Sequence, residues 1–443
     1  MAKVQIDNIA PGADRNAFDG AVGEALARWA RGTSLPILPQ YLGQVATRSV
    51  IPNNIATGFR SGNGQTFHVA QEDISELQVA YANWRHRNDA PYEEGSGGTL
   101  TVSASIQYPI AATPATGNWQ TFTWSGAANT GAIANGVTSA LSDALELATP
   151  IPRGAAFLLR WHAEATVQIP FFQYTASNSA AINQIAEASA TPAAFSDKTT
   201  GGAIASGTSA NNLYPVLIVG QTRRPSFYAF GDSRVQGVGD TFDATGNLGE
   251  LCRGIGEHFA YLNLGCPSAK LYQWLPNSTR RQALMPYFSH MVGNWSINDI
   301  ADSRTVAQLS ADITAAAALG KTWLAPSGRK VLWATMCPSS GLSSGTEYDV
   351  ADGSTQTVSG NNSLRTGVND LLRARMVPDV DAVLDIAAAM ENGINSGKWE
   401  VEGGGTGGST GKALTNDGLH ANWRGYQRIK QRVVAMLLAL ALP

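Results

Sequence analysis

The stretch Phe227-Tyr-Ala-Phe-Gly-Asp-Ser233 marks the point at which the chain changes character. Its four leading apolar residues predict a short buried strand, and the Gly-Asp-Ser that follows predicts a turn. Strand-like and helical runs then alternate. The helical runs lie near 247–259, 305–319, 362–376 and 421–440. One strand-like run ends at Gly265, and the others cover residues 291–293, 331–335 and 380–386. Such alternation indicates a parallel sheet with helices on both faces. We therefore predict an α/β domain over residues 221–443.

Upstream of this stretch the hydrophobic period changes to two. Apolar or small residues alternate with polar ones in three runs: Leu77, Val79 and Tyr81; Leu100, Val102, Ala104, Ile106 and Tyr108; and Leu159, Trp161, Ala163, Ala165 and Val167. Turn-rich pieces such as Ser61-Gly-Asn-Gly and Glu94-Gly-Ser-Gly-Gly separate the runs. Many short alternating strands with turns between them predict a β-sandwich, of jelly-roll type, over residues 45–220.

The remaining segments complete the predicted organisation. Phe18, Val22, Leu26 and Trp29 have helical spacing, so residues 1–44 are expected to hold one amphipathic helix and a lead-in segment. The Ala-, Ser-, Thr- and Gly-rich segment 173–212 predicts a long surface loop, and 221–225 a linker. Gly403–Gly411 predicts a flexible loop; it is not a phosphate loop, because no Gly-Lys-Ser/Thr follows it.

Composition excludes several classes of function. The formal charge is −3, from 31 basic and 34 acidic residues, and no dense Lys/Arg cluster predicts binding to nucleic acid. No apolar stretch is long enough to span a membrane, and the N-terminus lacks the basic-then-apolar pattern of a signal peptide. We expect a soluble protein, either cytoplasmic or delivered outside the cell by a phage particle or another non-classical route.

Cysteines and histidines give no metal pattern. Cys252, Cys266 and Cys337 form no C-x-x-C pair, so small buried apolar roles are favoured; a Cys252–Cys266 disulfide is the alternative. The histidines outside the C-terminal motif are spaced unlike metal ligands: His68, His86, His162, His258 and His290. No metal and no cofactor are therefore expected.

Ser233 is the first residue with candidate chemistry. A serine hydroxyl needs a base to become a nucleophile. Ser233 follows an apolar strand in a turn, a placement that exposes its hydroxyl at the carboxyl end of a sheet strand, where α/β sites form. The alternative role for this serine is to cap the following helix.

Asp417 and His420 supply a candidate acid–base pair. They are three residues apart, so a helical turn or tight loop can place them on one face. The carboxylate can then hold one imidazole nitrogen while the other nitrogen faces Ser233. The alternatives are an N-cap for the final helix at Asp417 and a surface histidine at His420.

Four short blocks in this order resemble the SGNH (GDSL) hydrolase family over about residues 225–443. They are Gly231-Asp232-Ser233 with Gly237 after it, Gly265, Ser296-Ile297-Asn298-Asp299, and Asp417-Gly418-Leu419-His420 with Gly425-Tyr426 after it. The resemblance implies a flavodoxin-like fold for residues 221–443. It also implies a nucleophile at Ser233, a general base at His420 and its orienting partner at Asp417. It also implies an oxyanion hole formed by the Ser233 and Gly265 N–H groups and the Asn298 side-chain amide. Two positions depart from the family pattern, Ser296 in place of a glycine and Arg234 after the nucleophile.

The resemblance implies hydrolysis of a carboxylic ester through an acyl-enzyme. SGNH enzymes with an added β-sandwich resemble carbohydrate esterases, so O-acetyl groups on a sugar or polysaccharide are the favoured substrate. Tryptophans that could stack on sugar rings or pack in the core are Trp84, Trp119, Trp124 and Trp161, and Trp295 could line a pocket. A general short-chain esterase or lipase-like enzyme is one alternative. A glycan-binding or phage structural protein with an inactive SGNH fold is another. The sequence does not specify an oligomeric state.

Overall fold

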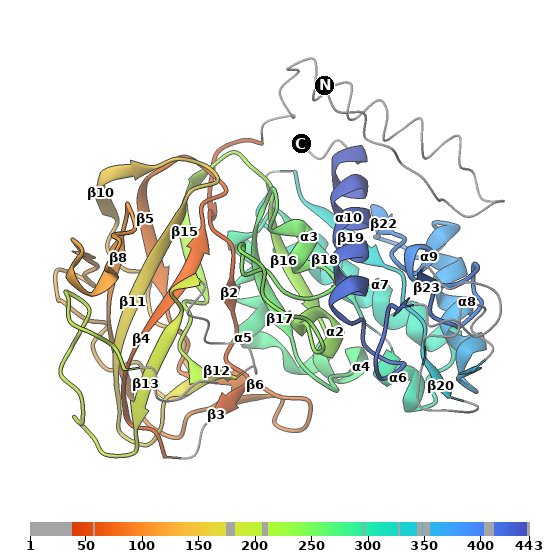
Figure 1. The fold of residues 1–443 in the computed structure, drawn as a ribbon, viewed down its shortest axis with the longest axis horizontal. Helices are drawn as coiled ribbons and strands as arrows, with labels where there is room; N and C mark the ends of the chain where they lie inside the picture. Colours follow the sequence, from red (N-terminus) through yellow and green to blue (C-terminus); the bar gives the residue numbers. More distant parts are fainter. Residues whose placement is uncertain are drawn as a thin grey trace.

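The computed structural model describes residues 38–55, 58–173, 182–205, 211–295, 297–326, 328–342, 348, 355–402 and 412–440. The helix predicted within residues 17–31 and the glycine-rich loop 403–411 lie outside the described residues. Figure 1 shows a β-rich part formed by the first half of the chain beside an α/β part formed by the second half.

The second half is organised around a six-stranded parallel sheet. Its order is β2 (Ser49–Val50), β17 (Ala260–Gly265), β16 (Ser226–Gly231), β18 (His290–Asn294), β19 (Lys330–Ala334) and β22 (Ala382–Leu384). All five neighbouring pairs are parallel. If β2 is left aside and the other strands are numbered along the chain, their order across the sheet is 2-1-3-4-5, which is the flavodoxin-like order. The predicted α/β class is confirmed.

Alternation along the strands explains why helices cover both faces of this sheet. Tyr228 and Phe230 of β16 pack in one buried cluster with α7 (Val306–Trp323) and α8 (Asn362–Arg373). Phe227 and Ala229 point to the opposite face and pack with α10 (Trp423–Ala439). Because every strand residue of β16 is buried, the sheet is continuous core and its ligand-binding positions are confined to the strand ends.

Two antiparallel sheets form most of the first half. One has the order β1 (Tyr41–Gln44), β15 (Leu217–Thr222), β5 (Ile74–Ala80) and β10 (Leu145–Ile151); the other has β13 (Ile185–Ser189), β4 (Ser61–Val69), β11 (Ala156–Ala165), β8 (Leu100–Gln107) and β9 (Gln120–Thr121). Leu77 and Val79 of the first share a buried cluster with Val102 and Leu159 of the second. The apolar residues of the period-two pattern therefore lie on the sheet faces that pack against each other. The jelly-roll topology stays a prediction.

Four local predictions need correction. Ser61-Gly-Asn-Gly, expected to be a turn between strands, is the start of β4 and pairs with β11 and β13. Residues 173–212 are not one loop, because Ile185–Ser189 form β13 and pair with β4; their alternation is hidden in a segment of low complexity. The helix expected over 247–259 is reduced to α3 (Cys252–Ile255), in a segment where glycines recur. Val167 lies two residues beyond the end of β11 and is 45% exposed, so it leaves the buried face.

The two halves share packing. Strand β2 comes from the first half yet pairs with β17 in the parallel sheet. Ile51, Trp84 and Val219 join Tyr228 and the inner residues of the parallel sheet in one buried cluster. The domain boundary at residue 220 stays a prediction. The two halves nevertheless contact each other through buried apolar side chains, as within a single hydrophobic core.

The cysteine prediction is confirmed. Cys252, Cys266 and Cys337 are all free and buried, so the alternative disulfide between Cys252 and Cys266 is wrong. Within the ranges given above, no helix has the length and apolar character needed to cross a bilayer.

Candidate active site

The nucleophile candidate lies at the switch point of the parallel sheet. Strand β16 ends at Gly231, and Ser233 begins the four-residue helix α2 (Ser233–Gln236). The Asp232 carboxylate caps this helix by accepting the Arg234 N–H at 2.9 Å. Chain order reverses between β17 and β18 on either side of β16, and ligands of such sheets bind at this position. Ser233 therefore has the placement that the sequence predicted.

His420 and Asp417 approach Ser233 from the loop before α10. The Ser233 Oγ and His420 Nε2 atoms are 2.8 Å apart, and His420 Nδ1 and Asp417 Oδ2 are 2.7 Å apart. These three residues, 187 positions apart at the extremes, form one hydrogen-bonded row. Such a row can move a proton from the hydroxyl to the imidazole while the carboxylate stabilises the imidazolium.

The loop that carries the pair is held by its own hydrogen bonds. Asp417 Oδ1 accepts the backbone N–H groups of Leu419 and His420 at 2.8 and 2.7 Å. Thr415 Oγ1 donates to the His420 carbonyl oxygen at 2.7 Å and accepts the Gly418 N–H at 2.9 Å. Burial alone would raise the pKa of Asp417, but its hydrogen bonds from the His420 imidazole and from these amides outweigh burial and lower the pKa. Asp417 is therefore ionised when it orients the histidine.

Asn298 lies in α6 (Ile297–Ala301), which follows the end of β18. Its Nδ2 donates to the Ala269 carbonyl oxygen at 3.0 Å and lies 3.4 Å from Asp232 Oδ2. A primary amide carries two N–H donors, and both are engaged here, one by Ala269 and the other, in the longer bond, by Asp232. Ser296, where the sequence departs from the family pattern, lies outside the described residues.

Gly265 lies at the end of β17, as expected, but its N–H group has a partner within the protein. Its N–H donates to Asn263 Oδ1 at 2.8 Å, so this amide is already engaged. A Cβ at Gly265 would lie 2.1 Å from the Gln236 nitrogen, which shows that the glycine lets β17 approach α2 closely. Asn263 also donates to the Val235 carbonyl oxygen at 3.0 Å. The expected oxyanion role is thus not supported by this geometry, and Asn263 is a supporting residue that the sequence reading missed.

The loop after Gly265 provides another backbone position. Ser268 is exposed and has φ of 60°, in the left-handed region that favours glycine. It directly precedes Ala269, whose carbonyl oxygen holds Asn298. A non-glycine residue in this conformation is a local signal of a constrained loop, and it is visible only in the structure.

Buried charge lies beneath the nucleophile turn. Burial raises the pKa of Asp232 to about 6, and it raises the pKa of Asp299 to about 6 as well. Asp299 accepts the N–H groups of Leu271 and Tyr272 at 3.1 and 3.2 Å, which connects α6 to the start of α4 (Leu271–Trp274). These carboxylates position the elements around Asn298.

Arg234, the second departure from the family pattern, has a structural explanation. Its guanidinium is buried and donates to the carbonyl oxygens of Cys337 and Pro338 at 3.0 and 2.8 Å. It thereby ties the nucleophile turn to the chain that follows β19. Arg234 is a supporting residue whose side chain points away from solvent.

Other candidates from the sequence are core residues. Trp84, Trp124, Trp161 and Trp295 are buried, so none presents a free face to a sugar. Trp119 is partly exposed, but the Arg160 guanidinium lies 4.5 Å from the centre of its ring. Among the described residues, no cluster of three or more His, Cys, Asp or Glu side chains could hold a metal ion.

Similarity to known proteins is found among solved structures. No family model matches the chain, and no curated protein matches it. Solved structures do match, among them a member of the lipolytic G-D-S-L family from Veillonella parvula, which is 17% identical, with 48% of this chain and 97% of that one covered and a TM-score of 0.31. Two others are the carbohydrate acetylesterase Est24 from Sinorhizobium meliloti (13% identity, 49% and 100% covered, TM-score 0.32) and the acetylxylan esterase Axe2 from Geobacillus stearothermophilus (12%, 49% and 94%, 0.32). Identities this low carry no information about substrate.

Proposed function

We propose that the protein is a serine esterase of SGNH type that removes O-acetyl groups from a carbohydrate. The observation that carries this proposal is the continuous row from Ser233 Oγ through the His420 imidazole to Asp417, with separations of 2.8 and 2.7 Å. It supports acyl transfer because it combines a nucleophile, a base and an orienting carboxylate in hydrogen-bonding distance.

In the proposed reaction Ser233 Oγ attacks the ester carbonyl carbon while His420 Nε2 takes the hydroxyl proton. The tetrahedral intermediate collapses to an acyl-serine, and the histidine gives that proton to the departing alcohol. Water, deprotonated by the same nitrogen, then releases the acid and restores the serine. Asp417 keeps the imidazole in the required tautomer throughout.

The negative charge of the tetrahedral intermediate needs donors. We assign this role to the Ser233 N–H, which as the first residue of α2 has no carbonyl partner within that helix. The second donor in this proposal is the Asn298 Nδ2 N–H whose long bond to Asp232, 3.4 Å, would be exchanged for one to the oxyanion. Because the Gly265 N–H is already hydrogen-bonded to Asn263, we assign the third donor to the Ser268 N–H. Ser268 lies in the loop whose Ala269 carbonyl oxygen accepts a hydrogen bond from Asn298. Removing one such donor typically lowers turnover by about 10²–10³-fold.

The experiment that tests this function is hydrolysis of p-nitrophenyl esters from acetate to octanoate by the wild type and by Ser233→Ala. Serine-dependent cleavage that is strongest for acetate is the expected result. Preference for long acyl chains would replace the substrate class with that of a general or lipase-like esterase. Absence of serine-dependent cleavage would contradict the proposed function.

A further inference from the structure

One peptide group lies at the centre of the loop that carries the candidate acid–base pair, the group between Gly418 and Leu419. Its N–H, that of Leu419, donates to Asp417 Oδ1 at 2.8 Å. Its carbonyl oxygen, that of Gly418, accepts the indole Nε1–H of Trp399 and the Ser340 N–H, each at 2.9 Å. Because a peptide group is planar, donors that fix its oxygen also fix the direction of the N–H on its other side. The orientation of the Asp417 carboxylate therefore depends on the donors to Gly418.

These bonds extend the proposed catalytic row into the protein interior. The row ends on Asp417, whose Oδ2 lies 2.7 Å from His420 Nδ1 and whose side chain is exposed to solvent. Water competes for the oxygens of such a carboxylate. Trp399 is buried, and a hydrogen bond shielded from water is stronger than an exposed one. The buried indole thus holds the exposed end of the row in place.

Gly418 lies directly against the segment that supplies the second donor. Its φ is 74°, and a Cβ at this position would overlap the Ser340 carbonyl oxygen. Only glycine combines this conformation with so close an approach. The loop therefore packs backbone against backbone on β20 (Ser340–Leu342), and its carbonyl group has a single direction.

Trp399 is itself held by a buried glutamine. Gln356 Oε1 accepts the Trp399 N–H at 2.7 Å, and Gln356 Nε2 donates to the Trp399 carbonyl oxygen at 3.0 Å. Gln356 begins β21 (Gln356–Val358), which pairs with β20. Its Oε1 also accepts the Ser340 hydroxyl at 3.3 Å. Both donors to Gly418 are thus fixed by one side chain before any substrate binds.

The segment that holds Gly418 also holds the nucleophile turn. The Arg234 guanidinium donates to the carbonyl oxygens of Cys337 and Pro338, and Ser340 follows two residues later. The nucleophile turn and the acid–base loop are therefore both attached to residues 337–340. This shared attachment sets the spacing between the nucleophile and its base.

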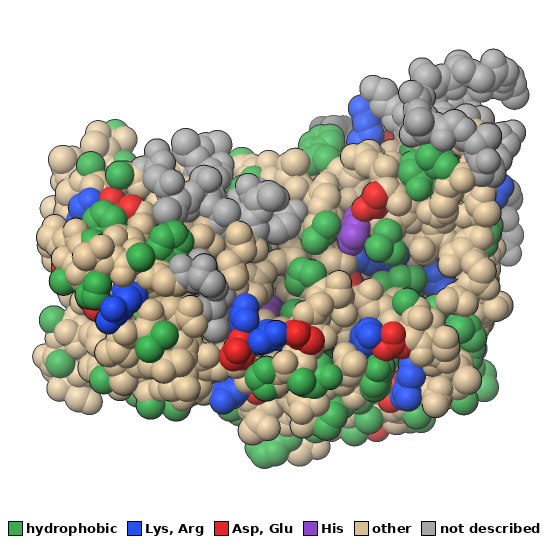
Figure 2. Space-filling view, turned by 90° about the horizontal axis from the view of Figure 1, so that it is seen from below, with side chains coloured by type: hydrophobic (Ala, Val, Ile, Leu, Met, Phe, Trp, Pro, Cys, Tyr) green, Lys and Arg blue, Asp and Glu red, His purple; other side chains and the backbone are tan. Residues whose placement is uncertain are grey.

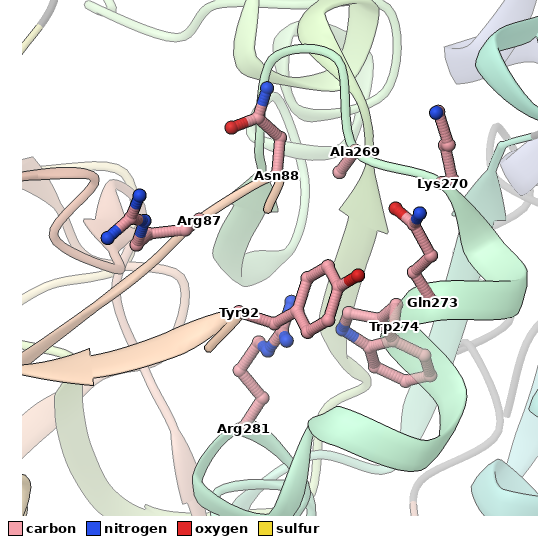
Figure 3. Close-up of a pocket in the computed structure, with 8 residues that line it drawn as sticks. All are labelled: Arg87, Asn88, Tyr92, Ala269, Lys270, Gln273, Trp274 and Arg281. Carbon is pink, nitrogen blue, oxygen red and sulfur yellow. The ribbon is translucent and has the colours of Figure 1, made fainter. Parts of the chain in front are cut away.

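The oxyanion side of the site is supported in another way. The Ala269 carbonyl oxygen accepts Trp295 Nε1 and Asn298 Nδ2, each at 3.0 Å. Figure 3 shows Ala269 next to Asn88, which belongs to the loop 87–92 of the β-rich half. Trp399 lies in the α/β half and contributes nothing to this contact. A substitution at Trp399 therefore changes the support of the acid–base pair alone.

We propose that Trp399 is a positioning residue for the esterase reaction, whose indole N–H holds the Gly418–Leu419 peptide so that Asp417 stays aimed at His420. This inference rests on the proposed esterase function. It adds to the site a buried tryptophan that acts through backbone atoms and lies outside the four sequence blocks.

The test measures kcat and KM for p-nitrophenyl acetate in Trp399→Phe, which keeps an aromatic ring and removes the indole N–H. An uncharged ester is chosen because acidic and basic side chains lie in small mixed clusters on the surface, as the face in Figure 2 shows, and would affect the binding of a charged one. The matched control is Trp161→Phe. Trp161 is also buried, and its Nε1 donates to Asn212 Oδ1 at 2.8 Å within the β-rich half.

We expect Trp399→Phe to lower kcat about tenfold, the factor that one buried hydrogen bond typically contributes, and to leave KM unchanged. Trp161→Phe should keep the kcat of wild type, although it loses the same atoms from a buried site. Thermal unfolding of both variants compares their losses of stability.

The double variant Trp399→Phe/Asp417→Asn separates positioning from a general loss of stability. Asp417→Asn removes the carboxylate that Trp399 positions, so in this background Trp399→Phe should lower kcat by less than about threefold. A merely structural effect would lower kcat by the same factor in both backgrounds. Gln356→Met removes the bonds to Trp399 and Ser340, and it provides the measurement if Trp399→Phe does not fold. Its kcat should also fall with KM unchanged.

Serine-dependent hydrolysis by wild type combined with a wild-type kcat in the folded Trp399→Phe variant, or in Gln356→Met if that variant is used, overturns this inference and leaves the proposed function intact. Equal losses of kcat in the two backgrounds overturn it in the same way. A wild type without serine-dependent hydrolysis overturns both.

Discussion

Asp417 is more exposed than its partner in the proposed catalytic row, with 53% of its side chain accessible against 14% for His420. We therefore expect Asp417 to contribute more by orienting the imidazole than by electrostatic stabilisation, because exposed ion pairs are weakened by solvent. Two backbone N–H groups hold Asp417 Oδ1, which leaves Oδ2 aimed at the histidine.

The variant Asp417→Asn tests this role. An amide can hold the wrong tautomer of His420, so we expect kcat to fall on the order of 10²-fold, less than the ~10⁴-fold typical of a buried triad aspartate. The measurement is kcat for p-nitrophenyl acetate, with Asp370→Asn, an exposed aspartate on α8, as the control. Equal kcat values in Asp417→Asn and wild type would show that another group holds the histidine.

Asp299 should make stability depend on pH. Its pKa in the folded protein is raised to about 6, chiefly by burial, so between its usual value near 3.8 and about 6 the folded state binds more protons than the unfolded state. The free energy of unfolding therefore falls as pH rises through this window. The ionised carboxylate costs the folded protein on the order of 3 kcal/mol at neutral pH, since one pKa unit equals ~1.4 kcal/mol.

The variant Asp299→Asn has no carboxylate to ionise at this position. The free energy of unfolding of Asp299→Asn minus that of wild type should therefore be larger at about pH 7 than at about pH 4. Weaker bonds to Leu271 and Tyr272 can lower the stability of the variant, but they do so equally at both pH values. Urea unfolding at both pH values measures this difference. A difference that does not change with pH would contradict the raised pKa.

Among the secondary-structure elements, β17 and α2 make a close contact beside the nucleophile. Gly265 makes it possible, because any Cβ there would meet the backbone of Gln236. Gly265→Ala should displace α2, destabilise the protein by about 1–3 kcal/mol and lower kcat by moving Ser233 from His420. Thermal unfolding and kcat measure both effects. If Gly265→Ala keeps the unfolding temperature and the kcat of wild type, α2 can shift without affecting stability or catalysis.

The elements differ in how well the sequence predicts them. The buried strands β16 to β19 and the long helices α7, α8 and α10 were predicted, because their hydrophobic periods are strong and local. Strand β2 has two residues and pairs with a strand more than 200 positions away, so no local pattern could reveal it. Strand β13 was missed because alanine and serine give a weak period.

The same distinction applies to the site. The four sequence blocks predicted the residues that lie around Ser233. The role expected for Gly265 rested on its position after a strand, and only the contacts to Asn263 and Gln236 revealed its packing function.

For the whole molecule, the shared core predicts that the halves do not fold independently. A fragment of residues 221–443 would lack β2 and expose the apolar side chains that now pack against Ile51, Trp84 and Val219. We expect this fragment to aggregate, while the full chain unfolds with both halves in one transition. Light scattering and thermal unfolding of each protein test this. A monomeric fragment with the unfolding temperature of the full chain would contradict it.

The central claim is that Ser233 is a nucleophile activated by His420, and covalent labelling tests it most directly. Diethyl p-nitrophenyl phosphate phosphorylates an activated serine and releases p-nitrophenolate. We predict a single diethylphosphoryl adduct, located on Ser233 by peptide mass spectrometry, and strongly reduced labelling in His420→Ala. Absence of an adduct on the folded wild-type protein, or an adduct on any other residue, would contradict the account.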